Sequence, residues 1–257
     1  MLKKVTLLRD RVQDWNEYPF CVPVIRSLEE LALRGRVCFF TGENGTGKST
    51  LLEAIAAHYG FGPEGGNRNL KADTTESNRS TEPLTRALRL SFDIRTGRGF
   101  FLRAESFFNT ATLIDRLDAE PGFSPHIIDS YGGRSLHERS HGETFFTLLQ
   151  TKFKSNGLFL LDEPEAALSP QRQLAFLVLM HDVLRRSKDA QFIISTHSPI
   201  LLAFPKAQIV SFDQAKLTEI EYENTSPAGI LHRFMSDREH FLEELLQDAP
   251  TLFNEEN

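Results

Sequence analysis

The chain has 257 residues, which is enough for one large domain with a substantial core. Its formal net charge of −6 argues against a protein whose main task is to grip nucleic acid electrostatically, although it does not exclude a local basic patch. The two cysteines, Cys21 and Cys38, provide no disulfide framework. Because no stretch is apolar enough for a signal peptide or a membrane span, we expect a cytoplasmic protein without membrane insertion.

The hydrophobic pattern predicts alternating strands and helices over most of the chain. Strands are expected near residues 5–8, 20–24, 37–41, 87–94, 100–103, 158–161, 191–195, 208–212 and 217–222. Helices are expected near residues 48–58, 105–117, 140–153, 170–186 and 227–247. This alternation predicts an α/β fold with a largely parallel sheet. The first strands have no helices between them, so we expect them to form a separate antiparallel β lobe.

We expect the whole chain, residues 1–257, to form one domain. Within it, residues at about 60–84 are rich in Gly, Asn, Ser and Thr and are predicted to be a polar loop. A helical lobe is predicted at about 105–155, and C-terminal helices with a tail at about 226–257. The tail is acidic and amphipathic, so it either packs on its own domain or docks a partner.

A glycine-rich stretch, Gly42–Ser49, matches the phosphate-binding pattern G-x-x-x-x-G-K-[ST] at every position. It lies between a predicted strand and a predicted helix, as the pattern requires. Glycines let successive backbone N–H groups face phosphates, and the helix N-terminus favours an anion. Lys48 would bridge the β- and γ-phosphates and Ser49 would ligate Mg²⁺; the alternative is a chance glycine-rich turn. The residues expected to contact the nucleotide are Glu43, Asn44, Gly45, Thr46, Gly47, Lys48, Ser49 and Thr50.

Two further candidates follow apolar strands. Asp162 and Glu163 come directly after the strand at 158–161. Asp162 is placed to hold Mg²⁺, and Glu163 to orient or deprotonate an attacking water; the alternative is a solvated strand end. His197 follows the strand at 191–195, where it could contact a γ-phosphate. Its alternative is a loop histidine beside a helix cap.

The stretch RSHGETFF, residues 139–146, predicts a helix start. Ser140 and Glu143 have the spacing of a capping box. The Ser140 hydroxyl, the Gly142 N–H group and the helix N-terminus together would make an anion site.

In chain order, these motifs resemble those of the ATP-binding-cassette (ABC) ATPases, over about residues 5–211. The forms LDEPEAALSP and STHSP are more similar to the SMC, RecF and OLD-type branch than to transporter subunits. The whole chain is similar to stand-alone bacterial ATPases. The resemblance implies a P-loop NTPase fold of the ABC ATPase head type. Such a fold has a largely parallel sheet, an antiparallel β lobe and a helical signature lobe.

The resemblance implies ATP and Mg²⁺ as cofactors and assigns roles to the motifs. Gly42–Ser49 would be Walker A, and residues 167–170 would be the D-loop. Asp162 would be the Walker B carboxylate, Glu163 the catalytic carboxylate and His197 the switch histidine. Lys48, Glu163 and His197 would therefore act in catalysis, and Ser49 and Asp162 would hold the metal.

The resemblance also implies a homodimer. In such proteins two subunits sandwich two ATP molecules, and each signature motif contacts the γ-phosphate that the other subunit holds. Residues 139–143 align with that signature. Ser140 and Gly142 are therefore expected to bind the nucleotide of the partner subunit.

The chain departs from the family pattern in two places. In the signature, His141 and Glu143 replace the usual residues. Between Thr50 and Arg139 the chain has no glutamine, whereas the family normally has one that reaches Mg²⁺ and the water. Glu105 is the candidate substitute; alternatively, it is an acid at a helix N-terminus that the helix dipole favours.

Three other side chains are weighed for the nucleotide or DNA. Either Tyr18 or Phe20 could stack on adenine, and core packing is the alternative for both. Arg68 resembles in position an arginine that SMC-type heads bring near ATP or DNA. Its alternative is a solvated loop arginine.

The motifs predict an ATPase that dimerises on ATP and acts as a switch for a protein partner or for DNA. One alternative is the cytoplasmic ATPase subunit of a transporter, which the missing glutamine disfavours. Another is the ATPase component of a DNA repair or defence nuclease complex. For that function the chain would need a partner, because no coiled-coil insertion or further acidic metal cluster is evident and we expect no appended nuclease domain before Asn257.

Overall fold

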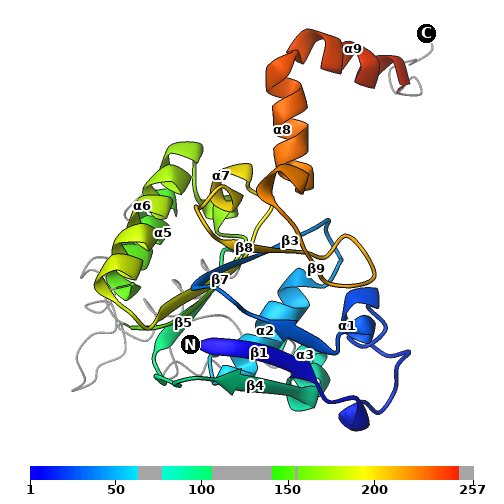
Figure 1. Cartoon of the computed structure of the whole chain (residues 1–257), viewed down its shortest axis with the longest axis vertical. Coiled ribbons are helices and arrows are strands. Elements are labelled where there is room, and N and C mark those ends of the chain that lie inside the picture. The colour runs from blue at the N-terminus through cyan, green and yellow to red at the C-terminus, as the bar shows by residue number, and fades with distance from the viewer. Residues whose placement is uncertain (63–76, 106–140, 154–155, 249–257) are drawn as a thin grey trace, which may run out of the picture.

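The computed structural model describes residues 1–62, 77–105, 141–153 and 156–248. A mostly parallel sheet lies between two helical layers, and a small antiparallel sheet flanks one of these layers (Figure 1). A two-helix arm at the C-terminal end extends away from this body. This arrangement confirms the predicted α/β fold with a largely parallel sheet.

The main sheet has the strand order β5-β6-β7-β3-β8-β9. Its strands are β3 (Val37–Thr41), β5 (Gly99–Arg103), β6 (Gly157–Asp162), β7 (Ala190–Ser195), β8 (Gln208–Ser211) and β9 (Thr218–Glu219). All neighbours are parallel except β8 and β9. The central strands are buried along their whole length, which explains why their sequences are continuous apolar runs.

Alternate side chains of each central strand enter two separate cores. Cys38 and Phe40 of β3 face the core that contains α2 (Lys48–Tyr59) and α3 (Ser77–Ala87). Phe39 faces the opposite core. There it meets the helices α5 (His141–Lys152), α6 (Pro170–Arg186) and α7 (Pro199–Leu202). The sheet is thereby held rigidly, and its carboxyl edge can position polar groups.

The antiparallel lobe has the order β2-β1-β4, with β1 (Leu2–Leu7), β2 (Glu30–Ala32) and β4 (Leu88–Phe92). The sequence predicted this lobe but placed a strand at 20–24, which is wrong. Residues Pro23–Ser27 form the short helix α1, because Pro23 starts the turn and Val24 and Ile25 are buried on one side. The short strand β2 was not predicted. A 3₁₀ turn, η1 (Arg9–Arg11), follows β1.

The predicted polar loop at 60–84 is also partly wrong, because α3 begins at Ser77. Polar composition hid a helical pattern in which Thr81 and Leu84 are buried against the body. Pro83 lies inside this helix. The predicted helix at 105–117 and the loop that follows it lie outside the described residues, as does Ser140.

The arm consists of α8 (Ser226–Ser236) and α9 (Arg238–Asp248), and η4 (Tyr222–Asn224) leads into it. Thr225 caps α8 by accepting a hydrogen bond from the Ala228 N–H group. Phe234 and Phe241 meet edge to face between the two helices. In the part of the chain that the structure describes, no helix is long and apolar enough to cross a membrane.

Candidate functional site

The glycine-rich loop connects the end of β3 to the start of α2, at the carboxyl edge of the sheet. Gly42, Gly45 and Gly47 have backbone φ values of 142°, 80° and 101°. Residues with a side chain rarely adopt such values. At Gly42 a Cβ atom would also lie 2.9 Å from Asp213 Oδ1. Asp213 accepts a hydrogen bond from the Glu43 N–H group at 2.7 Å. Asp213, which the sequence did not single out, thus fixes the first turn of the loop.

The rest of the loop is bound to itself and to its surroundings by short contacts. Thr46 Oγ1 donates to the Glu43 carbonyl at 2.8 Å, while Asn44 and Gly45 are exposed at the tip. In α2, Thr50 Oγ1 lies 2.9 Å from the Tyr18 hydroxyl. The exposed tip leaves the loop open toward solvent, as a phosphate-binding loop requires.

Lys48 lies at the first position of α2 and is buried. Its Nζ atom donates to the carbonyls of Gly42 at 2.6 Å and Glu43 at 2.9 Å. Burial lowers the pKa of Lys48, and the carboxylates of Glu163 and Asp162 oppose this shift. The ammonium group is therefore held inside the loop, where an anion would find a fixed counter-charge.

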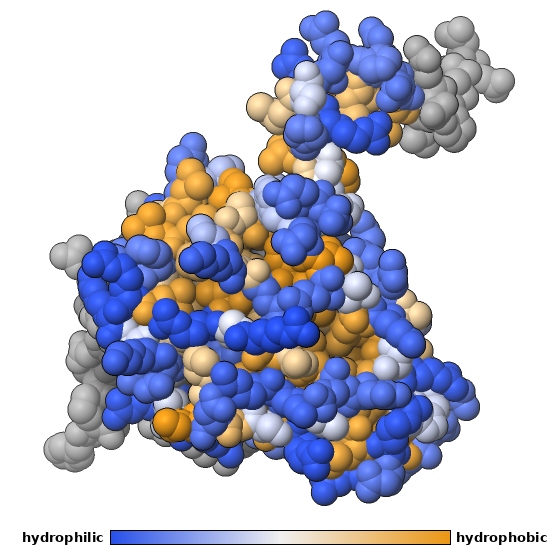
Figure 2. Space-filling model, in the orientation of Figure 1, coloured by the Kyte–Doolittle hydropathy of each residue, from blue (hydrophilic) through white to orange (hydrophobic). Residues whose placement is uncertain are grey.

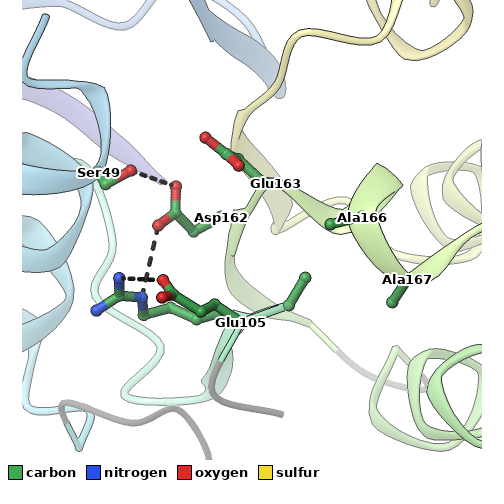
Figure 3. Close-up of a pocket in the computed structure, with 8 residues that line it drawn as sticks. Ser49, Glu105, Asp162, Glu163, Ala166 and Ala167 are labelled. Carbon is green, nitrogen blue, oxygen red and sulfur yellow. Dashed lines mark hydrogen bonds and ion pairs between the residues drawn. The ribbon is translucent and has the colours of Figure 1, made fainter. Parts of the chain in front are cut away.

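Ser49 and Asp162 come from α2 and β6, and their side chains meet (Figure 3). Ser49 Oγ donates to Asp162 Oδ1 at 3.0 Å. A hydroxyl and a carboxylate are the oxygen donors that Mg²⁺ prefers, and Mg²⁺ commonly takes few protein ligands together with water and phosphate oxygens. The pair therefore fits the metal that the family resemblance implies. Burial raises the pKa of Asp162, and the Arg103 guanidinium opposes that rise.

Glu163 and His197 lie beside this pair at the ends of two neighbouring strands. The Glu163 carboxylate extends from its backbone toward the side of the cavity where Ser49 and Asp162 lie (Figure 3). Its backbone φ of 48° is left-handed, an unusual conformation for a residue other than glycine. Glu163 Oε1 is 3.6 Å from His197 Nε2. The structure thus brings together Lys48, Ser49, Asp162, Glu163 and His197, and their individual roles stay predictions.

Two residues that the sequence reasoning missed support the His197 loop. Glu165 is mostly buried, and its Oε1 atom accepts the His197 N–H group at 2.6 Å. Gln173 donates to the Leu168 carbonyl at 3.0 Å and accepts a hydrogen bond from Ser198 Oγ at 2.5 Å. Gln173 therefore connects the predicted D-loop to the His197 loop, a link that spacing along the chain could not reveal.

A cavity of about 420 Å³ opens next to Asp162. Its lining residues are Ser49, Arg103, Ala104, Glu105, Asp162, Glu163, Ala166 and Ala167. Ala166 and Ala167 belong to η3 (Pro164–Ala167). Arg103, at the end of β5, was also missed, although its place beside the paired residue Asp162 follows from the parallel register.

Glu105 lies at the rim of this cavity and is 86% exposed. Its carboxylate contacts Arg103 at 3.2 Å, so its role as a substitute for the missing glutamine stays a prediction. Phe20 is buried against Trp15 and belongs to the core, while Tyr18 is exposed. Arg68 and Ser140 lie outside the described residues. Gly142 is in the first turn of α5.

The chain is similar to a family model over part of its sequence and to solved structures over most of its length. Residues 144–203 match the family model described as "AAA domain, putative AbiEii toxin, Type IV TA system". A nucleotide-free ATP-binding cassette from an ABC transporter is 18% identical with a TM-score of 0.48, and the match covers 93% of this chain and 97% of that one. The SMC head domain from Thermotoga maritima is 16% identical with a TM-score of 0.44, over 86% of this chain and 98% of that one. No curated protein matches the sequence.

The chain has a P-loop NTPase fold. This follows from its own topology: a glycine-rich loop connects the central parallel strand β3 to α2, and an acidic residue ends β6, which β7 separates from β3. The AAA-domain description of the family model agrees with this fold over residues 144–203.

Proposed function

We propose that the chain binds ATP with Mg²⁺, hydrolyses it, and pairs with a second copy of itself while ATP is bound. The observation that carries this proposal is the 3.0 Å contact between Ser49 and Asp162 beside the buried Lys48. This contact joins residues of two motifs that lie more than a hundred residues apart in sequence, which supports their acting as one nucleotide site. The nucleotide phosphates would fill the loop, and the metal would lie next to the Ser49–Asp162 pair.

Each remaining group has a role that fits its position. Lys48 would neutralise charge on the β- and γ-phosphates, and bound Mg²⁺ would stabilise the charge that develops as the γ-phosphate leaves. Glu163 would orient the attacking water and accept its proton. His197, beside Glu163, would keep that carboxylate directed toward the water and would contact the γ-phosphate.

The second subunit would complete the site. Ser140, and Gly142 in the first turn of α5, would contact the γ-phosphate held by the partner. Since neither site works without the other copy, ATP binding would drive association and hydrolysis would reverse it. Such a cycle suits a switch that signals to a protein partner or to DNA.

The test measures ATPase rate and molecular mass against protein concentration for the wild type and Glu163→Gln. We expect the specific activity of the wild type to rise with concentration. Glu163→Gln should lose most turnover and form a dimer that persists with ATP, whereas Glu239→Gln on the exposed surface of α9 should behave as the wild type. Activity independent of concentration, together with a monomeric Glu163→Gln protein in ATP, would refute the shared site.

A second variant isolates the partner's contribution. Ser140→Arg should still bind ATP but neither dimerise nor hydrolyse it, because the long cation would block the facing phosphate. Ser236→Arg, at the exposed end of α8, is the matched control. Normal dimerisation of Ser140→Arg would contradict the proposed contact between Ser140 and the partner's γ-phosphate.

The family-model description favours one setting for the switch. It names a toxin of a type IV toxin–antitoxin system, which is nearer to a DNA repair or defence assembly than to a transporter. Stimulation of ATP turnover by DNA would support the nucleic-acid alternative. Co-purification with a membrane protein would support the transporter alternative instead.

A further inference from the structure

Arg103 lines the cavity beside Asp162, and no motif accounts for it. It ends β5, where the parallel register pairs it with Asp162 at the end of β6. The Ala104 N–H group donates to the Asp162 carbonyl at 3.1 Å, so the backbone fixes the two residues side by side. The Arg103 side chain is only 20% exposed. Its position is therefore set by the sheet and is not that of a free surface arginine.

The Arg103 guanidinium contacts three carboxylates at once. Its Nη1 atom lies 2.8 Å from Glu53 Oε1, and its Nη2 atom lies 3.2 Å from Glu105 Oε2. Its Nε atom lies 3.6 Å from Asp162 Oδ2. Glu53, 15% exposed, stands one helical turn after Ser49 on α2. The strongest contact thus anchors the guanidinium to the helix that carries Ser49.

Asp162 divides its two oxygens between different partners. Oδ1 accepts the Ser49 hydroxyl, and Oδ2 faces Arg103. A divalent cation held by Ser49 and Asp162 would lie within a few Å of this guanidinium, where like charges repel strongly in a half-buried site. Arg103 thus supplies positive charge beside the buried carboxylate.

We propose that Arg103 is a positioning residue that takes the electrostatic place of the metal beside Asp162 until a nucleotide arrives. The inference rests on the proposed metal–nucleotide site. Arg103 keeps the carboxylate turned toward Ser49 and keeps free divalent cations out. The phosphates of ATP add enough negative charge to admit Mg²⁺ despite the arginine, so metal and nucleotide enter together.

The test measures binding of Mn²⁺, as a probe for Mg²⁺, to the nucleotide-free protein at pH 8 by electron paramagnetic resonance. Arg103→Gln leaves the carboxylates of Glu53, Glu105 and Asp162 without the cation that they share. We expect it to bind Mn²⁺ at least about tenfold more tightly than the wild type. Arg103→Lys keeps the charge and should stay within about threefold of the wild type.

Two controls locate the effect. Arg98→Gln removes the same charge just before the start of β5, roughly 16 Å away at the usual rise per residue, and should leave Mn²⁺ affinity unchanged. Adding Asp162→Asn to Arg103→Gln should abolish the gain. Unchanged or weaker Mn²⁺ binding by Arg103→Gln, in a protein that remains folded by circular dichroism, would overturn the inference.

The same titrations with ATP present separate this inference from the proposed function. A wild type that fails to bind Mn²⁺ with ATP would contradict the nucleotide site itself. The other outcome is that the wild type binds Mn²⁺ with ATP, but Arg103→Gln binds Mn²⁺ without ATP no more tightly than the wild type. That outcome would contradict only the role of Arg103.

Discussion

The carboxyl edge of the main sheet and the C-terminal arm place their side chains in opposite ways. At the sheet edge, charged groups such as Lys48, Asp162 and Arg103 are largely buried, and each contacts at least one polar or oppositely charged group. On the arm, large apolar side chains lie in solvent instead (Figure 2). They are Ile230, Leu231, Met235, Leu242, Leu245 and Leu246.

The two regions differ in the free-energy cost of placing their side chains. Burying a charge is costly unless a partner compensates it, so a buried charged cluster is a candidate functional site. Exposed apolar residues cost little in a single chain and only identify a surface that differs from its surroundings. Changes at the sheet edge should therefore affect chemistry and stability, whereas changes on the arm should affect neither in the isolated chain.

The largest expected effect is on catalysis. Lys48→Ala removes the fixed counter-charge of the phosphate loop and should lower the ATPase rate by about 10²–10³-fold, the usual loss for one such contact. Steady-state ATPase assays measure this directly. On the arm, Arg233→Ala removes an exposed cation that contacts Glu244 at 3.4 Å, and should leave the rate unchanged. Comparable losses of ATPase rate in both variants would show that the two regions do not differ in their effect on catalysis.

A pair of glycine substitutions compares the stability of the main sheet with that of the arm. At Gly99, at the start of β5, a Cβ atom would lie 2.0 Å from the Leu158 carbonyl oxygen, and φ is 145°. Gly99→Ala should lower the free energy of unfolding by about 1–3 kcal/mol or more. At Gly229, in α8, a Cβ atom would meet nothing within 4 Å. Gly229→Ala should be neutral or stabilising by up to about 1 kcal/mol.

Chemical denaturation of both variants measures this difference. Equal destabilisation at the two glycines would show that the arm is packed as tightly as the sheet.

A pH dependence should arise at the sheet edge. Burial raises the pKa of Glu53 from 4.5 to about 7, with Arg103 opposing the rise and the Asp162 and Glu105 carboxylates adding to it. An acid with a raised folded-state pKa contributes stability that is complete below its unfolded pKa and is lost as pH rises through the folded pKa. The melting temperature of the wild type should therefore fall relative to Glu53→Gln between about pH 4.5 and pH 7.

Thermal melts of both proteins across this range measure the difference. Glu105→Gln is the control, because it removes an 86% exposed carboxylate that also contacts Arg103. A difference between wild type and Glu53→Gln that stays constant with pH would show that Glu53 does not titrate there.

The smallest effect is expected on the arm itself. Leu245→Ser and Leu246→Ser replace side chains that are more than half exposed, so each should change the free energy of unfolding by no more than about 0.5 kcal/mol. Denaturant titration measures this value. A loss of 2 kcal/mol or more would mean that the arm packs against something in solution, such as a second copy.

The sequence allowed much of the site to be predicted because its chemistry is local. The glycine spacing and the Lys48–Ser49 pair define the loop without any tertiary contact. Buried strands such as β6 and β7 were predicted because a strand covered on both faces must be apolar throughout. The helices α1 and α3 were missed for the converse reason. Each owes its form to a few buried side chains in an otherwise polar or irregular segment.

The sequence by itself determined the features that depend on residues adjacent in the chain. These are the phosphate loop, the acidic end of a strand, and the alternation of strands and helices that gives an α/β fold. Only the tertiary structure decided which charged and polar groups from distant segments lie in contact. Asp213 on the loop, Glu165 under His197 and Arg103 among three carboxylates all lie at contacts that no spacing encodes. The parallel sheet creates them, because it brings the ends of separate strands to one edge, where burial makes every charge need a partner.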